Sequence, residues 1–377
     1  MKTGNIGMEP KIKILLICLT RRGGLLHFHD CLAESLSALG IVGMITAENA
    51  EHIGELRMNS EIQLFPLNTG TGKKGTIQRL LHPATWLRII QVFMHFRPDI
   101  VHITSAQEWN PFLGFFVRFI CRKPLVYTMH DVVHHEGTPR YFRITESIFR
   151  KIPRYFVVMT NQGKEILVSQ GFLPERILVV PHGIYDFFTQ GTKEAVLAKN
   201  EILFFGRIEL YKGLDILLKA LPPVFEKHPD WKLHIAGGGD LEPYRPYLTD
   251  QRIQITNRFV TDEEVAAFMR QASIVALPYL SASQSGVIPT AFAFHKAIIA
   301  TKVGGIPDMI ENRKTGILIP PHDVTALTQA LLELIEHPVL REKIGENGYV
   351  FANENLGWMA IARKHLDFYH RILSKSF

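Results

Sequence analysis

Residues 202–213 (ILFFGRIELYKG) contain the side chains whose types and spacing most clearly predict chemistry. An apolar run typical of a strand ends at Gly206, Arg207 and Lys212 follow it, and an amphipathic helix should begin directly after them. In an open α/β sheet, ligands bind beyond the carboxyl ends of the strands. A strand that ends in a glycine and is followed by two fixed cations therefore predicts a binding site for a pyrophosphate. The alternative is two ordinary surface cations.

Two further segments could bind an anion. Gly23 and Gly24 lie between the first expected strand and the first expected helix. Glycine lets the backbone approach a phosphate there, and the helix N-terminus adds partial positive charge; a tight turn alone would explain the same glycines. Residues 283–286 (SQSG) precede an apolar helix and could offer hydroxyls and free N–H groups. They could equally be a polar cap on that helix.

The elements that must position these residues follow an alternating pattern. Short apolar runs alternate with stretches of helical periodicity, which is typical of parallel α/β sheets. We expect helices at 25–39, 213–227, 262–271 and 286–295, a helical tail from 323 onward, and strands at 12–18, 41–46, 99–103, 124–129, 155–159, 176–181, 201–205, 231–236, 273–277 and 297–301. Polar residues 188–200 predict a linker, so two doubly wound domains should enclose a ligand cleft.

The net charge is unevenly distributed along the 377 residues. Residues 1–190 contain 21 Lys and Arg against 15 Asp and Glu, whereas residues 191–377 contain 21 of each. The whole excess of +6 therefore lies in the first half. That half should favour an anionic partner, such as a phospholipid surface or a phosphate-bearing substrate. A chance surplus of exposed arginines is the alternative.

A series of short motifs runs through the chain. In the second half these are 204–207 (FFGR) with 212–213 (KG), 233–240 (LHIAGGGD), 283–289 (SQSGVIP), 300–308 (ATKVGGIPD) and 315–320 (TGILIP). In the first half they are 23–24 (GG), 98–102 (PDIVH), 127–131 (YTMHD) and 180–183 (VPHG). This ordered series covers nearly the whole chain and resembles the retaining family-4 glycosyltransferases of the GT-B fold.

The resemblance implies an α/β fold with two doubly wound Rossmann-like domains facing across a cleft (GT-B). Residues 1–190 would form the N-terminal acceptor-binding domain, and residues 191–355 the C-terminal nucleotide-sugar-binding domain. Residues 356–377 would form a helix that packs back on the first domain, and a helix over Glu354–Ile372 matches it. The implied activity is transfer of a sugar from a nucleotide diphosphate sugar to an acceptor hydroxyl, with retained anomeric configuration.

The resemblance also assigns roles to single residues. Arg207 and Lys212 would neutralise the leaving diphosphate, and His130 would lie near the transferred sugar, unless it is a structural histidine. Asp308 falls where the family often has a carboxylate, although it could instead cap the following segment. The donor-binding residues that we expect are Gly23, Gly24, Gly206, Ser283, Ser285, Gly286, Val287, Thr290 and Asp308.

The chain departs from the family at two carboxylates. The family usually carries a Glu, seven intervening residues and a second Glu, but no Asp or Glu occurs between Val265 and Pro307 here. Ala282 falls near the first position and Thr290 near the second; a hydroxyl can still accept a hydrogen bond, without charge and with shorter reach. Two alternatives therefore stay open. One is a catalytically silent GT-B homologue that binds a nucleotide sugar or a partner transferase, and the other is a GT-B enzyme such as a sugar-nucleotide epimerase.

We expect no metal and no cofactor beyond the donor substrate. The absence of an Asp-x-Asp motif fits a transferase that uses fixed cations in place of a metal. The histidines and acidic residues at 130–136 lack a ligand from a second element at metal-binding spacing. Residues 237–240 and 69–76 do not complete a dinucleotide fingerprint or a P-loop. We also find no nucleic-acid motif.

Two segments of the first half could contact an anionic membrane. Arg79–Arg97 and Arg140–Arg154 interleave basic and large apolar residues, a pattern typical of amphipathic helices at an interface. They could instead bury one face in the first core. The longest apolar stretch, Pro111–Cys121, is too short to span a bilayer, contains Arg118 and predicts a buried helix.

The expected localisation is cytoplasmic, and a peripheral position at the inner face of the cell membrane is left open. The three cysteines show no paired spacing, which is typical of a reducing compartment, and no signal peptide is visible. By analogy with the family, the expected setting is bacterial surface polysaccharide or glycolipid assembly on a glycan or lipid-linked acceptor.

Overall fold

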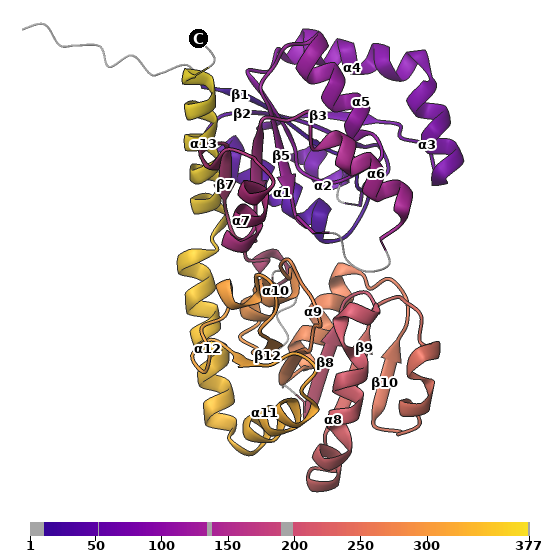
Figure 1. Ribbon diagram of the computed structural model, residues 1–377, viewed down its shortest axis with the longest axis vertical. Coiled ribbons are helices and arrows are strands. Elements are labelled where there is room, and N and C mark those ends of the chain that lie inside the picture. The colour runs from indigo at the N-terminus through magenta and orange to yellow at the C-terminus, as the bar shows by residue number, and fades with distance from the viewer. Residues whose placement is uncertain (1–10, 52, 134–137, 190–198, 376–377) are drawn as a thin grey trace, which may run out of the picture.

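The computed structural model of the chain describes residues 11–51, 53–133, 138–189 and 199–375 (Figure 1). It contains two parallel β-sheets covered by helices, one in the upper half of Figure 1 and one in the lower half. The prediction of two doubly wound α/β domains is confirmed. The predicted domain boundary at residue 190 lies outside the described residues.

The strands of the N-terminal sheet lie in the order β3-β2-β1-β4-β5-β6-β7. Their bounds are β1 (Lys13–Cys18), β2 (Ile41–Ala47), β3 (Ile62–Leu67), β4 (Ile100–Ile103), β5 (Leu125–Met129), β6 (Tyr155–Val158) and β7 (Ile177–Val179). The helices of this half are α1 (Gly24–Ser37), α2 (Ile53–Met58), α3 (Gly72–Leu81), α4 (Pro83–Phe96), α5 (Asn110–Phe115), the π-helix η1 (Phe116–Ile120), α6 (Arg140–Phe149), α7 (Asn161–Ser169) and the 3-10 turns η2 (Pro174–Arg176) and η3 (Asp186–Thr189).

The strands of the C-terminal sheet lie in the order β10-β9-β8-β11-β12-β13. Their bounds are β8 (Glu201–Phe205), β9 (Lys232–Ala236), β10 (Ile253–Thr256), β11 (Ile274–Leu277), β12 (Ala297–Thr301) and β13 (Ile317–Ile319). The helices are α8 (Leu214–Lys227), α9 (Asp262–Gln271), α10 (Val287–Ala293), α11 (Val324–Glu336), α12 (Pro338–Asn355), α13 (Trp358–Ser374) and the 3-10 turns η4 (Leu210–Lys212), η5 (Glu242–Tyr247) and η6 (Ile306–Asp308).

Strand β1 is apolar at nearly every position because both faces of its sheet are covered. Leu16 packs in a cluster with Phe28 and Leu32 of α1. Its neighbours Leu15 and Ile17 pack in a second cluster, which contains side chains of α4, α5 and η1. Helical layers on both faces of the sheet leave the carboxyl ends of its strands as the edge at which a ligand can bind.

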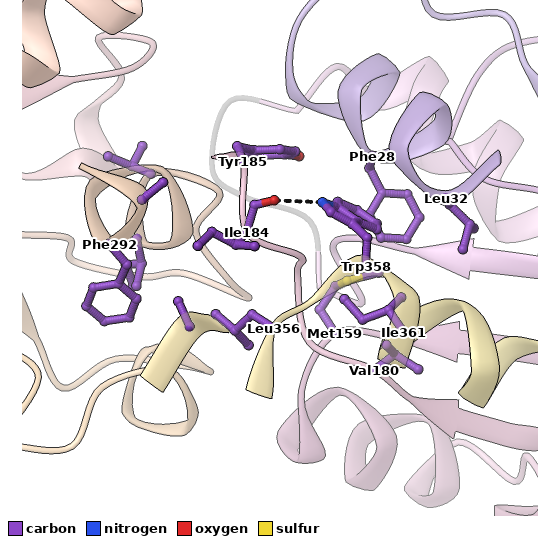
Figure 2. Close-up of a cluster of buried hydrophobic side chains, with 14 of the residues drawn as sticks. Phe28, Leu32, Met159, Val180, Ile184, Tyr185, Phe292, Leu356, Trp358 and Ile361 are labelled. Carbon is purple, nitrogen blue, oxygen red and sulfur yellow. Dashed lines mark hydrogen bonds between the residues drawn. The ribbon is translucent and has the colours of Figure 1, made fainter. Parts of the chain in front are cut away.

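The end of the chain crosses back to the N-terminal domain. Figure 1 shows α12 beside the lower half and α13 beside the upper half. Figure 2 shows the crossing, where the indole Nε1–H of Trp358 donates to the carbonyl oxygen of Ile184 at 2.7 Å. A Cβ on Gly183 would lie 2.3 Å from the Trp358 ring, so only glycine allows this close packing. The cluster drawn in Figure 2 joins Phe28 of the first domain to Phe292 of the second.

Several sequence-based expectations differ from the structure. The helix predicted over Glu354–Ile372 is present as α13 but begins later than expected, because α12 ends at Asn355 and α13 begins at Trp358. The stretch Pro111–Cys121 is only half buried: Leu113 and Val117 are enclosed, whereas Phe112, Phe115, Phe119 and Ile120 are exposed. Strands β3, β10 and β13 were not expected, and each lies at a sheet edge.

Candidate active site

The carboxyl end of β8 turns sharply at a glycine. Gly206 has a φ of +117°, and its N–H donates to the carbonyl oxygen of Ala236 at 3.0 Å. A Cβ on Gly237 would lie 2.0 Å from the Gly206 oxygen. The backbones of the loops after β8 and β9 are therefore in direct contact, with no side chain between them. Arg207 follows Gly206 at this edge of the sheet.

Arg207 is exposed and partly neutralised by a neighbour. Its side chain is 73% exposed, and its Nη1 lies 2.7 Å from Oε1 of Glu209. An exposed ion pair of this kind contributes little to stability. The guanidinium is therefore available to a stronger anion such as a phosphate.

Lys212 is held more firmly, at the end of η4. Its Nζ lies 3.9 Å from the centre of the Tyr279 ring, a cation–π distance. Burial lowers the pKa of Lys212, but the hydroxyls of Tyr279 and Tyr211 outweigh it, so the pKa lies above its ordinary value. The next residue, Gly213, is left-handed, and a Cβ there would lie 1.9 Å from the Pro278 oxygen. Lys212 is thus a charged ammonium on a short, fixed turn.

His130 lies on the opposite side, directly after β5. Its Nε2 lies 2.9 Å from the carbonyl oxygen of Thr104. A carbonyl can only accept, so Nε2 carries the proton and Nδ1 has a free lone pair. The side chain is buried, its Nδ1 has no partner among the described residues, and its ring packs edge-on to Phe28 at 4.8 Å. Burial lowers the pKa of His130, so the imidazole is a neutral acceptor.

Two cavities between the domains meet at His130. The first, here named the α7 cavity, has a volume of about 660 Å³ and is lined by His130, Thr160, Gln162, Tyr211 and residues 281–283. The second, named the α6 cavity, has a volume of about 670 Å³ and is lined by His130, residues from the start of α6 and Arg207. The structure therefore brings two of the three predicted catalytic residues, His130 and Arg207, to one cavity.

The predicted donor-binding segment before α10 is only partly exposed to these cavities. The described residues that line them include Ser283 but not Ser285, Gly286, Val287 or Thr290. The Ser285 hydroxyl accepts from the Val287 N–H at 3.3 Å and lies 3.2 Å from the Tyr279 hydroxyl. The Thr290 hydroxyl donates to the Gly286 oxygen at 2.8 Å. Both side chains are buried and bonded within the segment, so neither replaces a family carboxylate in the cavities.

Gly24 of the first domain is bonded to the segment 182–185, which follows β7. Gly23 has a φ of +80° and precedes α1. The Tyr185 hydroxyl donates to the Gly24 oxygen at 3.0 Å and accepts from Nε2–H of His182 at 3.2 Å. A Cβ on Gly286 would lie 3.8 Å from both rings, so this pair contacts the loops of both domains.

Sequence reasoning did not assign a role to His182 or Tyr185. Burial lowers the pKa of His182 to about 3, so it is neutral and keeps the proton that it donates to Tyr185. The motif 180–183 (VPHG) was a signal for this site, because a histidine between proline and glycine follows the last strand of the sheet. The contacts of His182 and Tyr185 at this site involve residues more than a hundred positions away in the sequence, so the motif alone does not predict them.

Asp308 makes a contact between the domains. Its Oδ2 accepts from the backbone N–H of Asn161 at 3.2 Å, at the N-terminus of α7. Asp308 is not among the described residues that line the two cavities. Its donor-binding role stays a prediction, whereas the structure shows a helix cap across the domain boundary.

No group of three or more His, Cys, Asp or Glu side chains suited to a metal occurs within the described residues. Residues 134–136 of the candidate cluster lie outside that part of the chain. Metal independence therefore stays a prediction.

Two family models match the two halves of the chain. A model of the glycosyl transferases group 1 matches residues 199–337, and a model of glycosyltransferase family 4 matches residues 32–186. The chain belongs to the family-4 glycosyltransferases. It is 28% identical over 295 residues to the D-inositol 3-phosphate glycosyltransferase of Corynebacterium kroppenstedtii. That alignment covers 70% of this chain and 65% of the relative, slightly less than two thirds of its length.

Solved structures of other proteins share the whole fold. A sucrose-phosphate synthase from Thermosynechococcus elongatus matches with a TM-score of 0.76 at 19% identity, over 97% of this chain and 100% of that chain. The Anabaena protein HepE, in complex with UDP and glucose, matches with a TM-score of 0.73 at 17% identity, over 94% and 98%. The GT-B fold predicted for this glycosyltransferase is confirmed.

Proposed function

We propose that this glycosyltransferase moves a sugar from a nucleotide diphosphate sugar to an acceptor hydroxyl, with retention of configuration at the anomeric carbon. One observation carries the proposal: Arg207 and the neutral acceptor His130 line the same cavity, with Lys212 fixed on the turn behind Arg207. Positive charge then lies where the diphosphate leaves, and a hydrogen-bond acceptor lies where sugar hydroxyls would be.

In the proposed reaction, the acceptor oxygen attacks the anomeric carbon on the face from which the diphosphate departs. The bond from that carbon to the phosphate oxygen breaks, and the new glycosidic bond forms on the same face. The acceptor proton passes to the departing phosphate oxygen, so no protein nucleophile is needed. Lys212 and Arg207 stabilise the diphosphate, and the His130 Nδ1 accepts a hydroxyl of the transferred sugar.

The similar structures support a proposal for the donor class. Structures of HepE contain UDP with glucose and also UDP-glucose, so we propose a uridine diphosphate sugar as the first donor to test. A thermal-shift screen with UDP, GDP, ADP and their common sugar conjugates, without and with EDTA, tests this. A shift with one nucleotide class that EDTA leaves unchanged supports a metal-independent transferase. A shift that EDTA abolishes would contradict metal independence.

A peripheral contact with an anionic membrane is part of the proposal. Leu87 and Met94 on α4 are 59% and 70% exposed, and Phe115 and Phe119 are each 54% exposed. The ring contacts between α4 and η1 place these helices in one layer, and Arg88 of α4 is exposed beside the apolar residues. Apolar side chains with cations are typical of an interfacial surface. None of the described helices combines the length and apolar composition needed to cross a bilayer.

Vesicle sedimentation tests this surface directly. The protein should sediment with vesicles of phosphatidylglycerol and phosphatidylcholine, and less with phosphatidylcholine alone. The double variant Phe115→Ser/Phe119→Ser should lose most of that binding while keeping its thermal midpoint. Unchanged sedimentation of the variant would remove the proposed surface.

The setting that we propose is bacterial surface polysaccharide or glycolipid assembly at the cytoplasmic face of the membrane, and the family resemblance supports it.

The alternative, a catalytically silent homologue, is favoured by the two positions, 282 and 290, at which the chain lacks the carboxylates usual in the family. Ala282 carries no hydrogen-bonding side chain, and the Thr290 hydroxyl is used within α10. A silent homologue should bind nucleotide but release no nucleotide diphosphate from any donor when acceptors are added. Release that depends on an acceptor supports the transferase.

A further inference from the structure

The glycine-rich stretch 69–76 (TGTGKKGT), which does not complete a P-loop, forms the turn after β3 and the start of α3. Gly70 has a φ of +70°, and a Cβ there would lie 2.2 Å from the Gly75 oxygen. The turn therefore packs directly on the first turn of α3. A cavity beside it, here named the α3 cavity, has a volume of about 300 Å³, which is at the lower end for small-ligand sites.

The wall of the α3 cavity consists of hydrogen-bonding groups. Each described residue that lines it is either polar or glycine. Its charged members are one carboxylate, Glu48, and one guanidinium, Arg79. The other side chains are amides and hydroxyls, those of Asn49, Asn68, Thr69, Thr71 and Gln78. Amides and hydroxyls both donate and accept, so the described wall matches the hydroxyls of a neutral sugar better than a lipid chain or a strongly charged ligand.

Hydrogen bonds fix part of this wall before any ligand binds. The Asn68 Nδ2 donates to Oε1 of Glu48, and the Asn68 Oδ1 accepts from the Gly70 N–H at 3.0 Å. The Thr69 hydroxyl oxygen accepts from Nη2 of Arg21 at 3.2 Å. A wall that is already ordered lowers the entropic cost of binding a ligand.

Other side chains of the α3 cavity are free to bind. Asn49, Gln78 and Arg79 are exposed, and within the described residues their side chains have no hydrogen bond or ion pair. Thr71 is at the N-cap position of α3, where threonine usually caps the helix, but its side chain makes no capping hydrogen bond. A ligand can therefore bind these groups without breaking an existing contact.

The α3 cavity lies at the same edge of the sheet as His130. The parallel strands β2, β1, β4 and β5 are neighbours in this order, so the loops that follow them lie at one edge. Three strand spacings, about 14 Å, separate β2 from β5. Arg21, in the loop after β1, donates to Thr69 and accepts from the Glu51 N–H at 2.8 Å. An acceptor that reaches from His130 to the cavity must therefore contain several sugar units.

We propose that the α3 cavity is an acceptor subsite, which binds a neutral sugar unit several units away from the hydroxyl that is glycosylated. Hydroxyls of this unit bind the free side chains of Gln78 and Arg79 and the fixed amide of Asn68. The inference rests on the proposed glycosyl transfer and names its acceptor class, an oligosaccharide and not a monosaccharide.

Glycan binding to the UDP-loaded protein tests the proposal without requiring turnover. The probes are an array of neutral di- to hexasaccharides, and titration calorimetry then compares each bound glycan with its monosaccharides. Each glycan is titrated free and as its octyl glycoside, which separates a soluble acceptor from a lipid-linked one. At least one oligosaccharide should bind about tenfold or more tightly than its monosaccharides, since the subsite adds hydrogen bonds. Equal binding of the monosaccharides, or no binding of any glycan, would overturn the proposal.

A variant of α3 identifies the residues. Gln78→Ala/Arg79→Ala should weaken binding of the oligosaccharide about tenfold, because two contacts are lost. Both side chains are exposed, so the thermal midpoint and the UDP affinity should not change. Arg57→Ala is the control, because Arg57 is an exposed arginine of α2 that is not among the described residues lining the cavity. Equal oligosaccharide affinity in the α3 variant and the unchanged chain would contradict the assignment.

Turnover separates this inference from the proposed function. Acceptor-dependent release of UDP tests the transferase activity. In Gln78→Ala/Arg79→Ala, KM for the oligosaccharide should rise about tenfold while kcat stays unchanged, because the subsite is remote from the reacting atoms. A protein that transfers sugar with the same KM in this variant would keep the proposed function and lose the inference. A protein that binds the oligosaccharide through these residues but transfers no sugar would lose the proposed function, while the carbohydrate site stands.

Discussion

The two walls of the cleft differ in charge and in origin. The C-terminal wall carries Arg207, and Lys212 lies on the turn that follows, outside the described lining of the two cavities; both side chains are charged and lie within seven residues of the end of β8. The N-terminal wall carries the neutral His130 with the carboxylates of Asp131 and Glu146, contributed by β5, its loop and α6. The difference separates two tasks. A departing diphosphate needs cations, whereas sugar hydroxyls need acceptors.

The largest effect should come from Lys212, the half-buried cation on the turn that follows Arg207. Lys212→Ala removes an ammonium held 3.9 Å from the Tyr279 ring centre, and kcat/KM should fall about 100-fold, as for loss of one fixed transition-state contact. Steady-state kinetics with the donor identified by thermal shift measures it. Lys219→Ala is the control, because Lys219 is an exposed lysine that pairs with Asp215 on α8. A loss below threefold in Lys212→Ala would remove the proposed diphosphate site.

Arg207 should matter less than Lys212. Its guanidinium is 73% exposed and already shares its charge with Glu209. Arg207→Ala should lower kcat/KM about tenfold, the lower end expected for a charge-assisted contact. Glu209→Gln should leave kcat/KM unchanged or raise it slightly, because it frees the guanidinium. An effect of Arg207→Ala larger than that of Lys212→Ala would reverse this order of importance.

The N-terminal wall should act on the sugar and not on the nucleotide. Glutamine at position 130 can still donate to the Thr104 oxygen, as Nε2–H does, but it lacks the Nδ1 acceptor. His130→Gln should therefore lower kcat/KM for the nucleotide sugar roughly fivefold, the loss of one neutral hydrogen bond. UDP affinity, measured by titration calorimetry, should be unchanged. An equal loss for UDP and for the nucleotide sugar would place His130 at the nucleotide instead.

Acidic pH should lower the stability of the N-terminal domain, because the histidines buried in it and against it are neutral in the folded state. Burial lowers the pKa of His29 and His182 to about 3 and that of His365 to about 4. The unfolded chain titrates near the ordinary value, so it binds more protons below pH 6.5 than the folded chain does. Stability is therefore full above pH 6.5 and falls as the pH drops toward 4, by about 1.4 kcal/mol per pH unit for each such group.

Urea unfolding at pH 7.5, 6.0 and 5.0 measures this dependence. In the His365→Gln variant the free energy of unfolding should depend less on pH. The difference in bound protons between the unfolded and folded states should fall by about one, because one buried imidazole is removed. The exposed His370, five residues further along α13, provides the control His370→Gln, which should leave the pH dependence as it is in the unchanged chain. An unchanged slope in His365→Gln would show that this imidazole does not stay neutral on folding.

The C-terminal wall could be predicted from the sequence because it is local. A strand, a glycine and two cations within twelve residues determine where Arg207 and Lys212 lie. The N-terminal wall and the contacts of residues 182–185 could be predicted only in part. His130 was expected at the end of a strand, but the Tyr185 bond to Gly24 spans 161 positions. The same holds for Asp308, whose partner is 147 positions away and in the other domain.

The strands that sequence reasoning missed are edge strands. Central strands such as β1 are apolar throughout because both faces are covered, and their runs are easy to see. Strand β10 has exposed or half-buried residues at each position, and β3 contains Pro66, which a sheet tolerates at its edge. These two segments form strands because they pair in parallel with their neighbours β9 and β2. Their own sequences show no apolar run that would predict this pairing.

The most direct test of the central claim is a proton NMR time course of the full-length protein with a uridine diphosphate sugar and an octyl glycoside. The account predicts that UDP appears only with acceptor present, that the new glycosidic linkage has the same anomeric configuration as the donor, and that Lys212→Ala slows both signals together. An inverted linkage, or acceptor-independent UDP release with no glycoside formed, would contradict it.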